Sequence, residues 1–339
     1  MKAFQLLLRI ASLTLLIAVC ATAEDAVVLV GAGSTLPAPL YASWTETYNS
    51  RNANFQVRYM PMSTREGIDQ ISHSIGDFGA GEVPLSDEQL HGSKLQLIQI
   101  PTVLVGIVPI YNLPGLKDTV KFSGPVLADI FMGRVKNWND PKLVKLNPGI
   151  SLPANPIKIV HRGDGKGTNY ILSDYLSKVS PVFQADIGRT ASPKWPAGSV
   201  IAQRSEDMVN SVKATIGAIG YVELDYAVKG GLPISLVQNA AGEFVKASPK
   251  TITAAAKDKT IPSDFRVSIT NSPGKDAYPI SSFTWLYIPG SGKPERLRAM
   301  KDFIDWALHQ GQEEAQQQGY TPLPSSLLAQ VEMKLNSIQ

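Results

Sequence analysis

Cysteine is almost absent from this sequence. Its 339 residues include one cysteine, Cys20, and four scattered histidines without the HExxH spacing. A disulfide framework and a cysteine metal centre are therefore excluded, and no metal site or cofactor is expected. An excess of one charge is also lacking, because 32 Lys and Arg residues stand against 29 Asp and Glu. A net charge of +3 gives no electrostatic footprint for nucleic acid.

Repeats, low-complexity segments and long uncharged apolar runs are also lacking beyond the first 23 residues. Hydrophobic residues make up 44% of the chain and charged residues 18%. Such a composition is typical of soluble globular proteins and excludes disordered, collagenous and solenoid chains. The length is sufficient for two domains with sizeable cores.

The first 23 residues have the three parts of a secretory signal peptide. Two basic residues precede an uncharged apolar run over residues 10–20, and the small residues Ala21-Thr22-Ala23 follow it. The apolar run is too short to span a bilayer. We therefore expect cleavage after residue 23 and export to the periplasm. A lipoprotein acylated at Cys20 is the alternative, disfavoured because the branched Val19 precedes the cysteine.

An apolar run over residues 26–30 ends in Gly31-Ala32-Gly33 and is followed by a helical pattern over residues 40–48. This order predicts a strand, a tight turn and a helix, with Thr35 as N-cap and Pro37 near the first turn. Similar alternation predicts strands at 55–59 and within 97–108, and helices near 67–74, 126–131 and 167–177. A last helix is expected between Pro294 and Gly311. Alternating strands and helices indicate an open α/β architecture.

Two apolar segments, residues 102–111 and 281–288, lie far apart in the sequence and enclose a stretch with its own alternation of helices and strands. We interpret them as strands that cross between two lobes at a hinge, with a cleft between the lobes. The expected organisation is a signal peptide at 1–23, lobe I at 24–103 and 282–339, and an inserted lobe II at 104–281.

The turn at residues 31–36 has the first two glycines of a GxGxxG dinucleotide motif, but Leu36 stands in place of the third. What the turn does offer is a helix N-terminus with free N–H groups beside the Ser34 and Thr35 hydroxyls. These groups suit an anion site. A plain turn is the alternative.

A second glycine-rich loop, residues 161–170, also opens a predicted helix. A glycine separates Lys166 from Thr168, so the loop does not match the GxxxxGK[ST] pattern of a P-loop. It nevertheless brings together the Arg162 guanidinium, which can bind an oxyanion in bidentate fashion, a lysine, a threonine hydroxyl and backbone N–H donors. The residues fit an anion site or an ordinary surface loop.

A third stretch, residues 76–86, places Glu82 among small residues that allow close approach of a ligand. Glu82 is either a solvated turn acid or a carboxylate directed into the cleft. In the second case a nearby Lys166 can form an ion pair with it or leave it facing the ligand. No nucleophile elbow, Cys–His pair or Ser-His-Asp set accompanies these loops, so no catalytic residues and no enzyme are expected.

Several blocks in this order resemble the periplasmic phosphate-binding proteins of high-affinity phosphate ABC transporters. They include GAGSTLPAPLY, DFGA, VPLS, RGDG and GAIGYVE, and they occupy residues 31–41, 77–80, 83–86, 111–115, 138–141, 147–149, 162–165, 167–168 and 217–223. The resemblance extends over nearly the whole chain after the signal peptide.

The resemblance implies a two-lobed type II periplasmic-binding-protein fold that closes on inorganic phosphate and delivers it to a membrane permease. Thr64 stands where the family has a serine donor, Glu82 replaces the aspartate that accepts the phosphate proton, and Lys166 replaces a serine. These two departures leave open another oxyanion or a phosphorylated solute; an exported phosphatase is a remote alternative. We expect a monomer whose ligand-binding residues are Ser34, Thr35, Leu36, Thr64, Glu82, Arg162, Lys166, Gly167 and Thr168.

Overall fold

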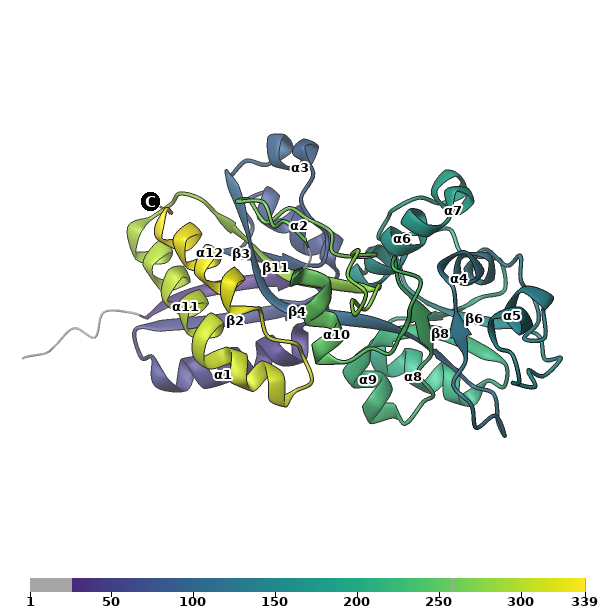
Figure 1. The fold of residues 1–339 in the computed structure, drawn as a ribbon. Coiled ribbons are helices and arrows are strands. Elements are labelled where there is room, and N and C mark those ends of the chain that lie inside the picture. Colours follow the sequence, from purple (N-terminus) through teal and green to yellow (C-terminus); the bar gives the residue numbers. More distant parts are fainter. Residues whose placement is uncertain (1–25, 258, 339) are drawn as a thin grey trace, which may run out of the picture.

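The structure is a computed structural model that describes residues 26–257 and 259–338. The expected signal peptide, residues 1–23 with Cys20, lies outside these ranges and stays a prediction. Within them, no helix is both long and apolar enough to cross a membrane. Figure 1 shows two groups of helices and strands side by side, connected by the long strand β4 (Leu97–Tyr111).

The first lobe alternates strand and helix, as the sequence predicts. Strand β1 pairs in parallel with β2 on one side and with β3 on the other. Its elements are β1 (Val27–Gly33), α1 (Ala38–Arg51), β2 (Phe55–Pro61), α2 (Thr64–Ser72), β3 (Phe78–Gly81), α3 (Asp87–Gly92), β11 (Ser281–Pro289), α11 (Pro294–Gln317) and α12 (Ser325–Asn336).

The second lobe is built from the chain between β4 and β11, and the predicted helices at 126–131 and 167–177 are α4 and α6. Its elements are β5 (Lys121–Phe122), α4 (Gly124–Phe131), α5 (Pro141–Leu146), β6 (Lys158–Arg162), α6 (Gly167–Val179), α7 (Pro181–Asp186), β7 (Val200–Ala202), α8 (Ser205–Ala214), β8 (Ala218–Glu223), α9 (Leu224–Gly230), β9 (Leu236–Gln238), β10 (Phe244–Val245) and α10 (Pro249–Lys257). The two lobes are therefore both α/β units.

Strand β4 belongs to both lobes. Residues 97–106 pair antiparallel with β11, and residues 107–111 pair antiparallel with β8. The sheets of the two lobes thus join into one open sheet in the order β2-β1-β3-β11-β4-β8-β6-β7, beside a small sheet β10-β9-β5. A backbone that is hydrogen-bonded in both lobes can bend at the change of partner, so this position is suited to be a hinge.

We propose the lobe boundaries that the sequence suggests, with 24–103 and 282–339 in lobe I and 104–281 in lobe II. The change of partner along β4 and the start of β11 opposite Gly106 support them. The chain just before β11 touches both lobes. Arg266 pairs with Asp87 of α3, and Lys178 of α6 donates to the Thr270 carbonyl.

The helix that the sequence suggests as the last, α11, is longer than expected, and α12 follows it. Leu297, Met300 and Phe303 are buried on one face as expected, but α11 continues to Gln317, so the expectation that it ends at Gly311 is wrong. Gly311 serves close packing instead. Trp44 donates its indole N–H to the Gly311 carbonyl, and a Cβ at this glycine would lie 2.8 Å from Trp44 Nε1.

Candidate functional site

The turn between β1 and α1 forms the first wall of the site. Ser34 donates its backbone N–H to the Ala80 carbonyl of β3, and its hydroxyl accepts from the Leu36 N–H at 3.1 Å. The expectation that Thr35 caps α1 is wrong, because the helix begins at Ala38 after Pro37 and has no side-chain cap. The Thr35 hydroxyl is directed across to the other lobe, where it accepts from Arg162 Nη2 at 3.3 Å.

The start of α2 carries the second group of lobe I. Ser63 caps the helix by accepting from the Glu66 N–H, which leaves the Thr64 hydroxyl available to donate to Glu82 Oε2 at 2.8 Å. Glu82 follows β3 and is completely buried. Its other oxygen, Oε1, has no hydrogen-bond partner among the residues that the structure describes. The interpretation of Glu82 as a solvated turn acid is therefore wrong.

The buried position changes the acidity of Glu82. Desolvation raises its pKa to about 7, and the hydroxyls of Ser34 and Thr64 oppose this rise. The negative charge of Glu223 adds to the rise, whereas the positive charge of Arg162 opposes it. Near neutral pH this carboxyl group can therefore either accept or donate a proton.

Arg162, the last residue of β6, forms the opposite wall. Its side chain is 1% exposed. Nη1 donates to the Ser205 hydroxyl at 2.9 Å, and Nη2 donates to the Gln203 carbonyl at 3.1 Å. Within the described ranges Nε has no hydrogen-bond partner. Because Ser205 and Gln203 belong to the same lobe, the guanidinium is positioned before the two lobes meet.

Helix α6 presents its N-terminus to lobe I. A Cβ at Gly167 would lie 1.7 Å from Glu82 Oε2 and 2.8 Å from Thr64 Oγ1, so only glycine allows this approach. The hydroxyl of Thr168 is buried and has no partner in the described part of the chain. The backbone N–H groups of a first helical turn have no intrahelical acceptor, so this end of α6 is rich in donors.

Lys166 lies beside these groups but does not contact Glu82. Its Nζ donates to the Met62 carbonyl of lobe I at 2.9 Å, and the described residues contain no Glu82–Lys166 ion pair. The Glu82–Lys166 ion pair that the sequence leaves open is therefore not formed. Burial lowers the pKa of Lys166, and the charge of Arg162 lowers it further. Lys166 thus connects the two lobes at the edge of the site.

Sequence reasoning missed two residues around Arg162, namely Ser205 and Glu223. Glu223 is buried, and its Oε1 lies 3.8 Å from Arg162 Nη1. The signal for Glu223 was present, because it ends the GAIGYVE block. Ser205 stands in a segment of charged residues that gives no such signal.

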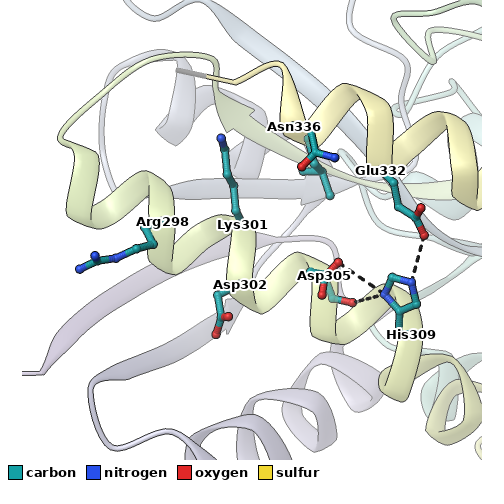
Figure 2. Close-up of a pocket in the computed structure, with 8 residues that line it drawn as sticks. Arg298, Lys301, Asp302, Asp305, His309, Glu332 and Asn336 are labelled. Atoms are coloured by element: carbon teal, nitrogen blue, oxygen red, sulfur yellow. Dashed lines mark hydrogen bonds and ion pairs between the residues drawn. The ribbon is translucent and has the colours of Figure 1, made fainter.

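A second titratable cluster lies away from this site. When protonated, His309 on α11 forms ion pairs with Asp305 at 3.5 Å and with Glu332 on α12 at 3.0 Å, beside a cavity of about 430 Å³ (Figure 2). A hydrogen bond to the Asp305 carbonyl raises the pKa of His309. The contact between His309 and Glu332 connects α11 with α12. No group of His, Cys, Asp and Glu within 26–257 and 259–338 has an arrangement that could hold a metal ion.

At the junction of the lobes, Thr64 and Gly167 lie against the Glu82 carboxyl group and Thr35 contacts the Arg162 guanidinium, while Lys166 reaches the Met62 carbonyl beside them. Ser34 and Leu36 contact each other within the turn of lobe I. Unpartnered polar atoms of Glu82, Arg162 and Thr168 occur together at this junction. Buried polar atoms are normally satisfied, so such a group indicates a place for a ligand with several oxygens. A guanidinium, hydroxyls and a helix N-terminus suit an oxyanion.

Comparison with known proteins identifies a family for this chain. A sequence model of the PBP superfamily domain matches residues 21–310. The phosphate-binding protein PstS of Xylella fastidiosa is 38% identical over 306 residues, which cover 89% of this chain and 83% of that one. PstS of Pasteurella multocida is 37% identical over 324 residues, which cover 94% and 93%.

A solved structure also resembles the chain. The ABC-type phosphate transport receptor of Vibrio cholerae superimposes with a TM-score of 0.63 over 87% of this chain and 100% of that one. The two sequences are 16% identical. At that identity the likeness supports the two-lobed fold and carries no information about the ligand.

Proposed function

The chain belongs to the PBP superfamily and, within it, to the family of the phosphate-binding proteins PstS, and from this premise we propose that it captures inorganic phosphate between its lobes and delivers it to an ABC importer. It is a solute-binding transport component and not an enzyme. Its relatives are named for phosphate binding, and the unpartnered buried polar atoms of Glu82, Arg162 and Thr168 support the same ligand.

The observation that carries the proposal is the buried carboxyl of Glu82 among donors for an anion. A carboxylate repels an anion unless the anion brings a proton to share. Hydrogen phosphate has such a proton near neutral pH, whereas sulfate does not, so Glu82 in its ionised form favours phosphate and rejects sulfate. The raised pKa of Glu82, about 7, is matched to a shared proton.

We assign the following roles to the site residues. Arg162 and the first turn of α6 supply charged and backbone donors from lobe II, and Thr35 and Thr64 supply hydroxyls from lobe I. Glu82 accepts the proton of the ligand. The complete proposed set is Ser34, Thr35, Leu36, Thr64, Glu82, Arg162, Lys166, Gly167 and Thr168.

The tight junction of the lobes bears on the alternatives. Gly167 approaches Glu82 so closely that a Cβ has no room. A phosphorylated solute would need space beyond its phosphate group, and the burial of Glu82, Arg162 and Thr168 therefore favours the free ion. We further propose that the protein is a monomer in the periplasm, without nucleic-acid partners, and that it docks on a membrane permease.

The test is calorimetric titration of ligand-stripped protein with phosphate, arsenate, sulfate and a phosphomonoester. We expect tight binding of phosphate and arsenate, weak binding of sulfate and no turnover of the ester. Preference for sulfate or for the ester would show that the protein's ligand is not inorganic phosphate. Release of phosphate from the ester would show that the protein is an enzyme.

A further inference from the structure

Glu223 is a buried carboxylate that the proposed phosphate site does not use. It is the last residue of β8 and pairs with Ile107 of β4, and its side chain is 3% exposed. Neither of its oxygens has a hydrogen-bond partner in the part of the chain that the structure describes. A buried carboxylate without hydrogen bonds lowers stability unless an opposite charge compensates it.

Arg162 supplies that opposite charge. Its Nη1 lies 3.8 Å from Glu223 Oε1, which is within ion-pair distance but too long for a hydrogen bond. The guanidinium is held instead by its hydrogen bonds to Ser205 and to the Gln203 carbonyl. Glu223 therefore acts on Arg162 through its charge, whereas Ser205 and Gln203 fix the orientation of the guanidinium.

The two charges stay together when the lobes separate. Arg162 ends β6 and Glu223 ends β8, and both strands belong to lobe II. Thr35, the contact of Arg162 in lobe I, is an uncharged hydroxyl. An arriving anion consequently meets a guanidinium whose positive field is partly cancelled by Glu223, in the open form as well as the closed form.

We propose that Glu223 limits the affinity of the site: its charge weakens the hold of Arg162 on every bound oxyanion equally and leaves the choice between phosphate and sulfate to Glu82. This inference rests on the proposed function, because it places the anion against Arg162. A weaker hold gives faster release. Fast release is what a protein that hands its cargo to a transporter requires.

The test is the substitution Glu223→Gln, which removes the charge and keeps the shape. We expect phosphate and sulfate each to bind about tenfold more tightly, with the ratio of their affinities unchanged. Asp225→Asn is the matched control. Asp225 is a largely buried carboxylate two residues further on, but its partner is Lys229 at 3.4 Å, so this variant should bind both anions as the wild type does.

Glu223→Met provides a second uncharged side chain of similar length if the amide disturbs folding. Unchanged or weaker binding of both anions by the folded variants would overturn the inference, and so would a gain limited to one anion. A gain that persists in combination with Arg162→Ala would show that Glu223 does not act through Arg162. A wild-type protein that binds no phosphate would instead reject the proposed function itself.

Discussion

The two lobes contribute different sets of groups to the anion site. Lobe I supplies hydroxyls and the buried carboxyl of Glu82, whereas lobe II supplies the Arg162 guanidinium and the N-terminus of α6. Lobe II is therefore built to attract an anion of any kind. Lobe I tests whether the anion carries a proton, because only a protonated ligand can donate a hydrogen bond to the buried carboxylate of Glu82. Attraction of the anion and selection by its proton are thus carried by different lobes. The two functions act together when the lobes close.

Replacement of Arg162 by alanine should have the largest effect on binding. Charge-assisted hydrogen bonds contribute ~1.5–3 kcal/mol each, so we expect phosphate affinity to fall at least about 10- to 100-fold. The affinity for sulfate should fall in parallel, because Arg162 attracts both anions without selecting between them. Calorimetric titration measures both anions.

Arg134→Ala is the control for this substitution. Arg134 also lies in lobe II, but it is half-exposed and paired with Asp186 on the surface, so its loss should leave both affinities unchanged. Unchanged affinity in Arg162→Ala would remove this guanidinium from the site and would contradict the assignment of attraction to lobe II.

Gly167→Ala should break the junction between the lobes. The new Cβ would lie 1.7 Å from Glu82 Oε2, so the closed form cannot be reached without displacing the carboxyl group. We expect phosphate affinity to fall by about tenfold or more and small-angle scattering to show no compaction on addition of phosphate. Gly92→Ala, where a Cβ meets nothing within 4 Å, is the control. Normal compaction in Gly167→Ala would show that the lobes meet differently.

Glu82→Gln should alter selection and leave attraction in place. An amide no longer repels an unprotonated anion. The affinity for sulfate should therefore rise relative to that for phosphate, by about tenfold in the ratio of affinities. An unchanged ratio would show that this carboxyl group does not sense the proton. Arg162→Ala provides the contrast, because there both affinities should fall together.

The pH dependence of stability gives a second measurement on Glu82. Its pKa in the folded protein, about 7, lies above the ordinary value, so the folded chain holds this proton to higher pH than the unfolded chain. The resulting stability is fully present below the ordinary pKa and is lost as the pH rises through about 7. Ligand-free wild type should therefore lose thermal stability over that interval relative to Glu82→Gln. Parallel curves would contradict the raised pKa.

The sequence predicted the alternation of strands and helices because apolar periodicity and glycine turns are local signals, as at residues 26–48. It also placed Arg162 and Glu82 in the candidate site from the chemistry of their loops and from the family resemblance. The contacts of Lys166 and Glu223 could not be predicted, because they depend on which side chains of distant segments meet at the junction. The extension of α11 beyond Gly311 was missed for the same reason, since Trp44 belongs to another helix.

Lys166→Ser is expected to weaken phosphate binding less than Arg162→Ala does. Lys166 Nζ donates to the Met62 carbonyl across the junction, so its loss removes a contact that exists only when the lobes are together. A single charged hydrogen bond at a half-buried position corresponds to ~1–2 kcal/mol, and we expect phosphate affinity to fall by about five- to thirtyfold.

The loss in Lys166→Ser should appear as faster release and not as altered selection, because Lys166 does not contact Glu82. Stopped-flow measurement of phosphate release separates the two possibilities. Arg65→Ala is a comparison variant, since Arg65 also reaches across the junction, to the Ser192 hydroxyl, and should likewise speed release without changing the ratio of phosphate to sulfate. A changed ratio in Lys166→Ser alone would place its ammonium group against the anion, and selection would then no longer belong to lobe I only.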